Sequence, residues 1–128
     1  ALSPFSERGG KLILYHGGSD TSFSVQDTID YYNALGASNQ NVSNFARLFV
    51  VPGMNHCSGG PATDSFDALT PLVNWVEKGT APDSIVAAAS NPGYFNVASR
   101  TRPLCPYPKQ TRYKGLGDIN DAANFVCQ

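Results

Sequence analysis

The sequence predicts an α/β fold in which parallel strands are joined by crossover helices and followed by an irregular tail. Two short apolar runs of strand length alternate with two segments whose apolar residues recur at helical spacing. Strands that are connected through a helix in this way run parallel, with right-handed crossovers. From residue 91 onward the chain is rich in proline, which favours irregular structure.

The first strand is expected over Lys11–His16, an apolar run that glycine pairs precede and follow. A helix then begins after Ser24, a good N-terminal cap, and Asp27 three residues later adds a weak capping box. Gly36 is predicted to end this helix. The residues that share its apolar face are Val25, Ile29, Tyr32 and Leu35.

The second strand is expected over Arg47–Val51. Asp64 or Ser65 is predicted to cap a second helix, in which Pro71 implies a kink or a 3₁₀ start. Its apolar positions also follow helical spacing: Phe66, Leu69, Leu72, Val73 and Val76.

A further short strand is expected over Ile85–Ala89, and one helical turn over Asp121–Phe125. We expect residues 1–90 to form the strand–helix–strand–helix part of one domain, and residues 91–128 to form an extension packed on it. Buried parallel strands need neighbours on both sides. The sequence therefore looks like the C-terminal portion of a larger protein.

Composition limits the possible partners and environment. The length of 128 residues fits one domain, and nine Lys and Arg against ten Asp and Glu give a net charge of −1. This balance argues against a protein that binds nucleic acid or anionic membranes through bulk charge. Charged residues make up 15%, against about 25% in an average soluble domain. The low charge favours a secreted or periplasmic protein, whose signal peptide would then lie upstream.

The chain has three cysteines, and an odd number in a secreted protein indicates one internal bridge plus one sulfur with a partner elsewhere. The alternative is three reduced, buried thiols in a cytosolic protein.

Two loops carry side chains suited to acid–base chemistry. Asp20 follows the first strand, and His56 follows the second in the string PGMNHCSGGP. Active sites of α/β folds lie beyond the C-terminal ends of the strands, so these two side chains can come within hydrogen-bonding reach. The carboxylate would then orient an imidazole that acts as a general base. The order acid-then-histidine is that of α/β-hydrolases, but the G-x-S-x-G motif of their nucleophile is missing here.

Each of these residues also has a simpler interpretation. Asp20 could form an Asx turn beside Gly-Gly-Ser, and His56 could be an ordinary polar loop residue. His16 is expected to be structural, because His16, His56 and Cys57 match no compact zinc pattern. No metal site is therefore predicted.

Three segments resemble the C-terminal part of the tannase/feruloyl esterase family: HGGSD, PGMNHCSGGP with the downstream NWVEKGTAPDSIVA, and RPLCPYPKQTRYKG with the following GD-x-NDAANFVC. Members are secreted serine esterases with an α/β-hydrolase core, and relatives hydrolyse terephthalate monoesters. The resemblance covers nearly the whole chain and implies that residues 1–90 belong to the catalytic domain. It implies that Asp20 is the triad acid and His56 the general base. The nucleophilic serine, the oxyanion hole and a calcium-binding lid would lie upstream, so no cofactor is expected in this chain.

The resemblance also implies how the sulfurs pair. Cys57 would bridge to a cysteine outside these residues, beside the nucleophile, whereas Cys105 and Cys127 would form a second, C-terminal bridge. Cys57 would thus link the chain to an upstream segment or a second chain of the same enzyme.

We therefore expect two triad residues of a secreted ester hydrolase that acts on aromatic esters such as feruloyl or galloyl esters. Phe23, three residues after the acid, is expected either to contact the aromatic ring of the substrate or to pack in the core. Without the serine, the 128 residues alone are expected to be inactive. The alternative from another class is a non-catalytic, secreted binding module stabilised by disulfides.

Overall fold

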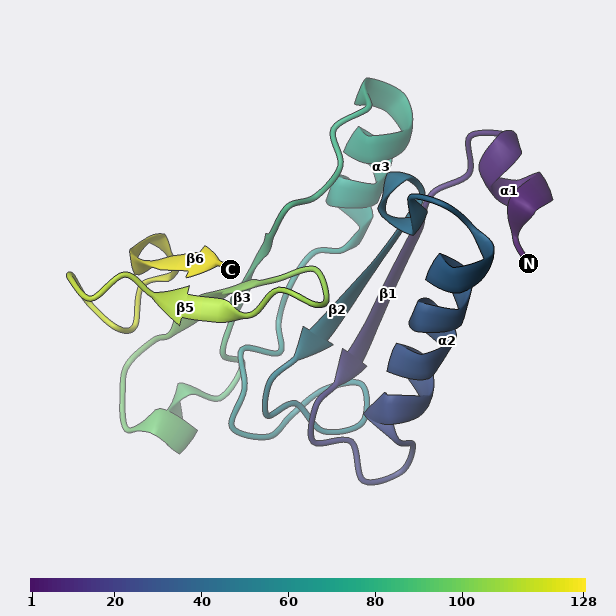
Figure 1. The fold of residues 1–128 in the computed structure, drawn as a ribbon. Coiled ribbons are helices and arrows are strands. Elements are labelled where there is room, and N and C mark those ends of the chain that lie inside the picture. The colour runs from purple at the N-terminus through teal and green to yellow at the C-terminus, as the bar shows by residue number, and fades with distance from the viewer.

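The computed structural model describes residues 1–128, with a parallel pair of strands between the helices and the tail (Figure 1). Strands β1 (Leu12–Gly17) and β2 (Ala46–Val51) pair in parallel, with Leu12 opposite Ala46 and Gly17 opposite Val51. Helix α2 (Val25–Ser38) makes the crossover between them. The two strands therefore end level with each other, and the loops that follow them start from the same edge of the sheet.

Helix α2 begins as the sequence predicts and ends later. The Ser24 side chain accepts a hydrogen bond from the Gln26 backbone N–H at 3.2 Å. Gly36 does not end the helix, because it lies inside α2, which continues to Ser38. The Asn39 side chain donates to the Leu35 carbonyl at 3.0 Å, so a polar side chain satisfies the last turn beyond the glycine.

Helix α3 (Leu69–Lys78) begins later than expected, because its cap is neither Asp64 nor Ser65. The Asp67 carboxylate accepts hydrogen bonds from the backbone N–H groups of Leu69 and Thr70, at 2.9 and 3.0 Å. Phe66 is consequently outside the helix. Pro71 falls in the first turn, where a missing N–H leaves no helical bond unmade.

The two residues expected to cap α3 instead join distant parts of the chain. The Asp64 carboxylate accepts hydrogen bonds from the Ser90 backbone N–H at 2.9 Å and from its hydroxyl at 2.7 Å. It also accepts one from the Gly59 backbone N–H at 2.8 Å. Ser65 forms a β-bridge with Ala88. Both contacts hold the loop after β2 against the next strand.

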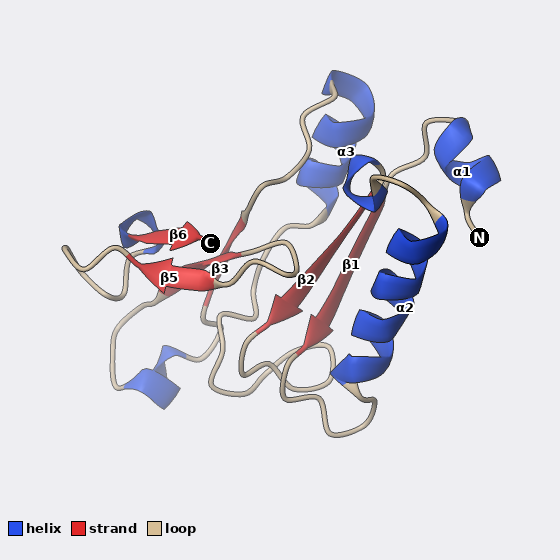
Figure 2. Cartoon of the chain, in the orientation of Figure 1, coloured by secondary structure: helices blue, strands red, loops and turns tan.

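The short strand expected over Ile85–Ala89 is present, and further short strands lie beyond residue 91, where the sequence predicts irregular chain (Figure 2). Strand β3 (Ile85–Ala88) pairs antiparallel with β4 (Thr101–Leu104), and β5 (Thr111–Tyr113) pairs antiparallel with β6 (Phe125–Cys127). The expected helical turn is present as a 3₁₀ helix, Ala122–Asn124. Other short elements are α1 (Ser3–Glu7) and the 3₁₀ helices Val42–Asn44 and Pro92–Phe95.

Cys105 and Cys127 form a disulfide, as the resemblance implies, with a sulfur–sulfur distance of 2.04 Å. The tail also reaches the central sheet, since the Tyr107 backbone N–H donates to the Leu48 carbonyl at 2.7 Å. This contact occupies the outer edge of β2, whereas the outer edge of β1 pairs with no strand of this chain.

The core lies on both faces of the β1–β2 pair. One cluster packs α2 against the sheet and is formed by Tyr32, Phe45, Ala46 and Leu48. The other joins the sheet to β3 and β4 and is formed by Phe49, Val51, Met54, Ala62, Ile85, Ala87 and Leu104. Because both ends of the loop after β2 are anchored in the second cluster, the loop starts from a rigid base.

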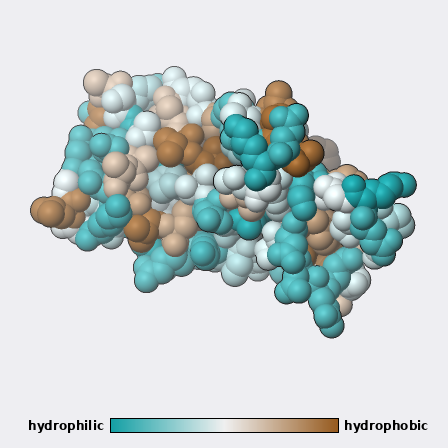
Figure 3. All heavy atoms as spheres, turned by 90° about the horizontal axis from the view of Figure 1, so that it is seen from above, coloured by the Kyte–Doolittle hydropathy of each residue, from teal (hydrophilic) through white to brown (hydrophobic).

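The surface mixes polar atoms with patches of hydrophobic ones (Figure 3). Helix α3 contributes several exposed apolar side chains, among them Leu69, Val73 and Val76. None of the helices combines the length and the apolar character that are needed to cross a membrane.

Candidate functional site

The loops that follow β1 and β2 meet at the lower end of the sheet in Figure 1. They bring Asp20 and His56 together, with His56 Nδ1 at 2.8 Å from Asp20 Oδ2. A carboxylate oxygen only accepts hydrogen bonds, so Nδ1 carries the proton and donates it. The two residues that the sequence predicts as an acid–base pair are therefore in direct contact.

The Asp20 carboxylate is held by its own loop. Its Oδ1 accepts hydrogen bonds from the backbone N–H groups of Ser22 and Phe23, at 2.8 and 2.9 Å. The hydrogen bond from Phe23, above all, lowers the pKa of Asp20 far below its usual range. Burial opposes this shift, and the hydrogen bonds from His56 and Ser22 add to it. Asp20 is therefore ionised at neutral pH, although only 3% of its side chain is exposed.

Backbone contacts fasten the two loops to each other. The Ser19 N–H donates to the Met54 carbonyl at 3.0 Å. At Gly17 the chains approach so closely that a Cβ atom would overlap the carbonyl oxygens of Met54 and Asn55. A glycine is required there, because any side chain would push one of the two loops away.

The His56 ring presents its other nitrogen to the outside. The side chain is 47% exposed, and Nε2 has no hydrogen-bond partner in the chain. The Phe23 ring lies beside it, with centroids 5.3 Å apart and planes tilted by 49°. Phe23 is 65% exposed, so the residues of this chain do not bury it. Phe23 and His56 both line an open hollow of about 400 Å³.

His16 also belongs to this cluster, although the sequence indicates only a structural role for it. Its Nδ1 is 2.8 Å from Thr28 Oγ1, and its Nε2 is 3.1 Å from the Phe23 carbonyl oxygen. The same Nε2 is also 3.1 Å from Asp20 Oδ2. The sequence offers one signal for this contact: His16 lies near the end of the predicted strand, four residues before Asp20.

Cys57 lies next to His56 and has no bonded partner within the chain. It is exposed, its backbone is left-handed with a φ of 63°, and it lines the same hollow. The absence of an internal partner agrees with the pairing that the resemblance implies, in which Cys57 joins a cysteine elsewhere.

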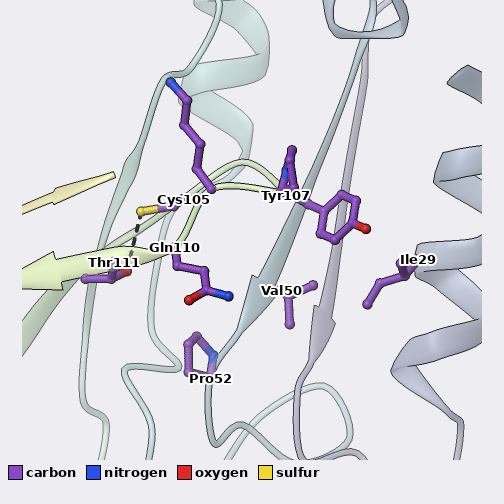
Figure 4. A pocket seen from close by; sticks show the side chains of 9 residues that line it. Ile29, Val50, Pro52, Cys105, Tyr107, Gln110 and Thr111 are labelled. Atoms are coloured by element: carbon purple, nitrogen blue, oxygen red, sulfur yellow. Dashed lines mark hydrogen bonds between the residues drawn. The ribbon is translucent and has the colours of Figure 1, made fainter. Parts of the chain in front are cut away.

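A second hollow, of about 370 Å³, lies between α2 and the tail (Figure 4). Apolar side chains such as Ile29 and Val50 face it from one side, and the segment from Cys105 to Thr111 faces it from the other. No histidine or carboxylate lines it. The contact between Asp20 and His56 lies in the other hollow.

No group of three or more His, Cys, Asp or Glu side chains is placed to hold a metal ion.

Comparison with known proteins identifies the family. The profile described as "Tannase and feruloyl esterase" matches residues 1–128. The chain belongs to the tannase and feruloyl esterase family. Its resemblance to that family, based on the strings around Asp20 and His56, is thereby confirmed.

Related proteins of the tannase and feruloyl esterase family include a mono(2-hydroxyethyl) terephthalate hydrolase from Piscinibacter sakaiensis. It is 67% identical over 98% of this chain, which spans 21% of that protein. The crystal structure of feruloyl esterase B from Aspergillus oryzae superposes with a TM-score of 0.80 and 32% identity, covering 100% of this chain and 29% of that one. A second esterase from Aspergillus oryzae gives a TM-score of 0.78 and 29% identity, covering 99% of this chain and 29% of that one.

These matches confirm the predicted fold, which is α/β and of the α/β-hydrolase type. The chain spans well under a third of the length of each of these relatives.

Proposed function

We propose that this chain supplies the acid, Asp20, and the general base, His56, of a serine carboxylic ester hydrolase. The observation that carries the proposal is the 2.8 Å contact between them, with His56 Nε2 left without a partner beside an open hollow. The nucleophilic serine would come from a segment outside these 128 residues. Membership of the tannase and feruloyl esterase family supports this assignment.

In the proposed reaction, His56 Nε2 takes the proton of the serine hydroxyl while the serine oxygen attacks the ester carbonyl. Asp20 keeps the His56 proton on Nδ1 and stabilises the imidazolium that forms. The tetrahedral intermediate collapses, and the alcohol leaves with the proton from Nε2. Water then loses a proton to Nε2 and attacks the acyl-enzyme, and Nε2 returns this proton to the serine oxygen as the acid is released.

The proposed substrates are esters of aromatic acids. Phe23 offers an exposed ring next to the base, and aromatic rings bind one another in tilted or offset arrangements. The relatives include a terephthalate monoester hydrolase and a feruloyl esterase. An aromatic acyl group placed on Phe23 would have its ester carbonyl close to His56.

We further propose that the enzyme is secreted or periplasmic and that Cys57 bridges to a cysteine beside the nucleophile. Such a bridge needs an oxidising compartment, as does the Cys105–Cys127 disulfide. It would tie the loop of His56 to the loop of the serine and limit their relative movement.

The test is an assay of the full-length protein on mono(2-hydroxyethyl) terephthalate, methyl ferulate and methyl gallate. We expect turnover of at least one, and a loss of several orders of magnitude in kcat for His56→Ala. A phosphonate probe for activated serines should label a serine outside these 128 residues in the wild type. The isolated chain should be inactive. Undiminished activity of His56→Ala, or labelling of a serine within the chain, would refute the assignment.

A further inference from the structure

His16 contacts the same carboxylate oxygen as His56. Its Nε2 lies 3.1 Å from Asp20 Oδ2, and His56 Nδ1 lies 2.8 Å from that oxygen. The two imidazoles differ in exposure, with 14% of the His16 side chain accessible against 47% for His56. Asp20 therefore contacts two histidines that both line the hollow, of which His56 is half exposed and His16 is largely enclosed.

The partners of His16 determine which of its nitrogens carries a proton. Nε2 meets only acceptors, the Asp20 carboxylate and the Phe23 carbonyl oxygen, each at 3.1 Å. A ring nitrogen can approach both only as an N–H donor. Nδ1 lies 2.8 Å from the Thr28 hydroxyl, which can donate to a bare nitrogen or accept from a protonated one. In either case an N–H group of His16 points at the loop of the acid.

We propose that His16 is a positioning residue: its Nε2–H binds the Phe23 carbonyl and lies 3.1 Å from the Asp20 carboxylate, and these two contacts keep the acid in the arrangement that receives His56. This role rests on the proposed function, because it affects turnover only if Asp20 and His56 are the acid and base. Thr28 belongs to α2, so its hydroxyl anchors the His16 ring to the crossover helix. The acid is thereby fixed from α2 as well as from its own loop.

The contacts of the Asp20 carboxylate explain why the loss of His16 would affect its position. A carboxylate has about four acceptor sites. Ser22 and Phe23 donate to Oδ1, while His16 and His56 meet Oδ2. Without His16, Oδ2 has no fixed partner other than His56, which is itself half exposed. An error of about 1 Å in the placement of a catalytic group can cost about 100-fold in rate.

The test compares two variants of the full-length enzyme that have side chains of similar length. His16→Met removes the donor, whereas His16→Gln places an amide N–H near the position of Nε2. We expect kcat to fall by about 10- to 100-fold in His16→Met with KM close to wild type, and to recover largely in His16→Gln. The downfield proton resonance of the His56 Nδ1–H should be lost or displaced in His16→Met and retained in His16→Gln.

Equal activities of the two variants would overturn the role of His16, whether both match the wild type or both fall together with the thermal midpoint. If His16→Met does not fold, the proposal can still be tested on the wild type, because the ¹⁵N resonances of the histidine rings report which ring nitrogen of His16 carries the proton. A proton on Nδ1 and none on Nε2 of His16 would overturn the proposal. His56→Ala separates the two ideas: if it is inactive while His16→Met has wild-type activity, only the role of His16 is wrong. If His56→Ala retains activity, the proposed function fails and the role of His16 fails with it.

Discussion

His56 Nδ1 lies 2.8 Å from Asp20 Oδ2, although 36 residues separate them along the chain. The parallel register explains this proximity, since Gly17 at the end of β1 is opposite Val51 at the end of β2. Beyond that point the two loops remain in contact, since the backbone of Gly17 lies so close to the Met54 carbonyl that no Cβ atom would fit between them. The sheet thus delivers the two side chains to one place, and the loops then hold them there.

Replacing Asp20 by Asn should inactivate the enzyme while leaving the loop folded. The Asn oxygen can still accept from Ser22 and Phe23, but its NH₂ group would face the N–H of His56. The ring would then favour the wrong tautomer, and an Asp-to-Asn change at a triad acid costs about 10⁴-fold in kcat. Steady-state kinetics and circular dichroism check this, with Asp30→Asn on the exposed face of α2 as the control. A decrease of less than about tenfold would contradict the role of Asp20.

Replacing Gly17 by Ala should separate the two loops. The added methyl group would meet the carbonyl oxygens of Met54 and Asn55, so the base would move relative to the acid. We expect a loss of about 100-fold in kcat/KM. Gly18→Ala is the matched control, because its Cβ would make only ordinary contacts, the nearest at 3.4 Å. Equal effects of the two substitutions would show that the close approach is not what sets the geometry.

The stability of the protein should depend on the ionisation of Asp64. Burial raises the pKa of this carboxyl, but hydrogen bonds from Ser90 and Gly59 outweigh it, and the pKa is lowered on balance. A pKa that is lower in the folded state stabilises the fold above the ordinary aspartate value, and this contribution is lost as the pH falls below about 4.

Thermal midpoints measured between pH 3 and 7 check this dependence. Asp64→Asn should lower the thermal midpoint at pH 7. The difference in midpoint between the wild type and the variant should become smaller as the pH falls. Asp30→Asn, which alters an exposed carboxylate, is the control. A constant difference across the pH range would mean that the charge of Asp64 is unimportant.

Loss of the Cys105–Cys127 disulfide should destabilise the tail. The bridge spans 22 positions of the chain. It restricts the conformations of the unfolded chain and would thereby add about 3 kcal/mol to the free energy of unfolding. The double variant Cys105→Ala/Cys127→Ala should unfold at lower denaturant concentration, and Asp20 and His56 should remain in contact. Chemical denaturation of the variant and of the reduced wild type measures the effect. An unchanged midpoint would show that β5 and β6 are held by packing alone.

Peptide mapping of native protein without reduction should find Cys57 linked to a cysteine outside these residues. The physical reason is that a free thiol beside the base would be open to oxidation, whereas a bridge restrains the loop of His56. Alkylation before and after reduction provides the control. A bond from Cys57 to Cys105 or Cys127, or a free Cys57 thiol, would be inconsistent with the pairing that the family resemblance implies.

The sequence predicts the parts of this structure that depend on periodicity and on strand order. The two parallel strands, the first helix and the meeting of Asp20 with His56 follow from those patterns. The cap of the second helix was mispredicted because Asp64 is bonded to Ser90, which lies 26 positions away, and Asp67 is left to cap α3.

Contacts made by the backbone of a loop could not be predicted. The chain turns back after Asp20, so that the Asp20 carboxylate and the Phe23 carbonyl both lie 3.1 Å from the same ring nitrogen of His16. The loop path depends on the Asp20 side chain itself, which binds the N–H groups of Ser22 and Phe23. Such a mutual dependence has no periodic signal in the sequence.

The backbone and the side chain of Phe23 serve different parts of the site. Its N–H group holds Asp20 and its carbonyl meets His16, while its ring lies in the open beside His56. Any residue supplies the same two backbone groups except proline, which lacks the N–H. A single nucleotide change at this codon can therefore replace the side chain that lines the hollow without disturbing the backbone contacts of Asp20. In the proposed enzyme, position 23 would be a place where substrate preference diverges between related genes while the proton transfer chemistry is inherited intact.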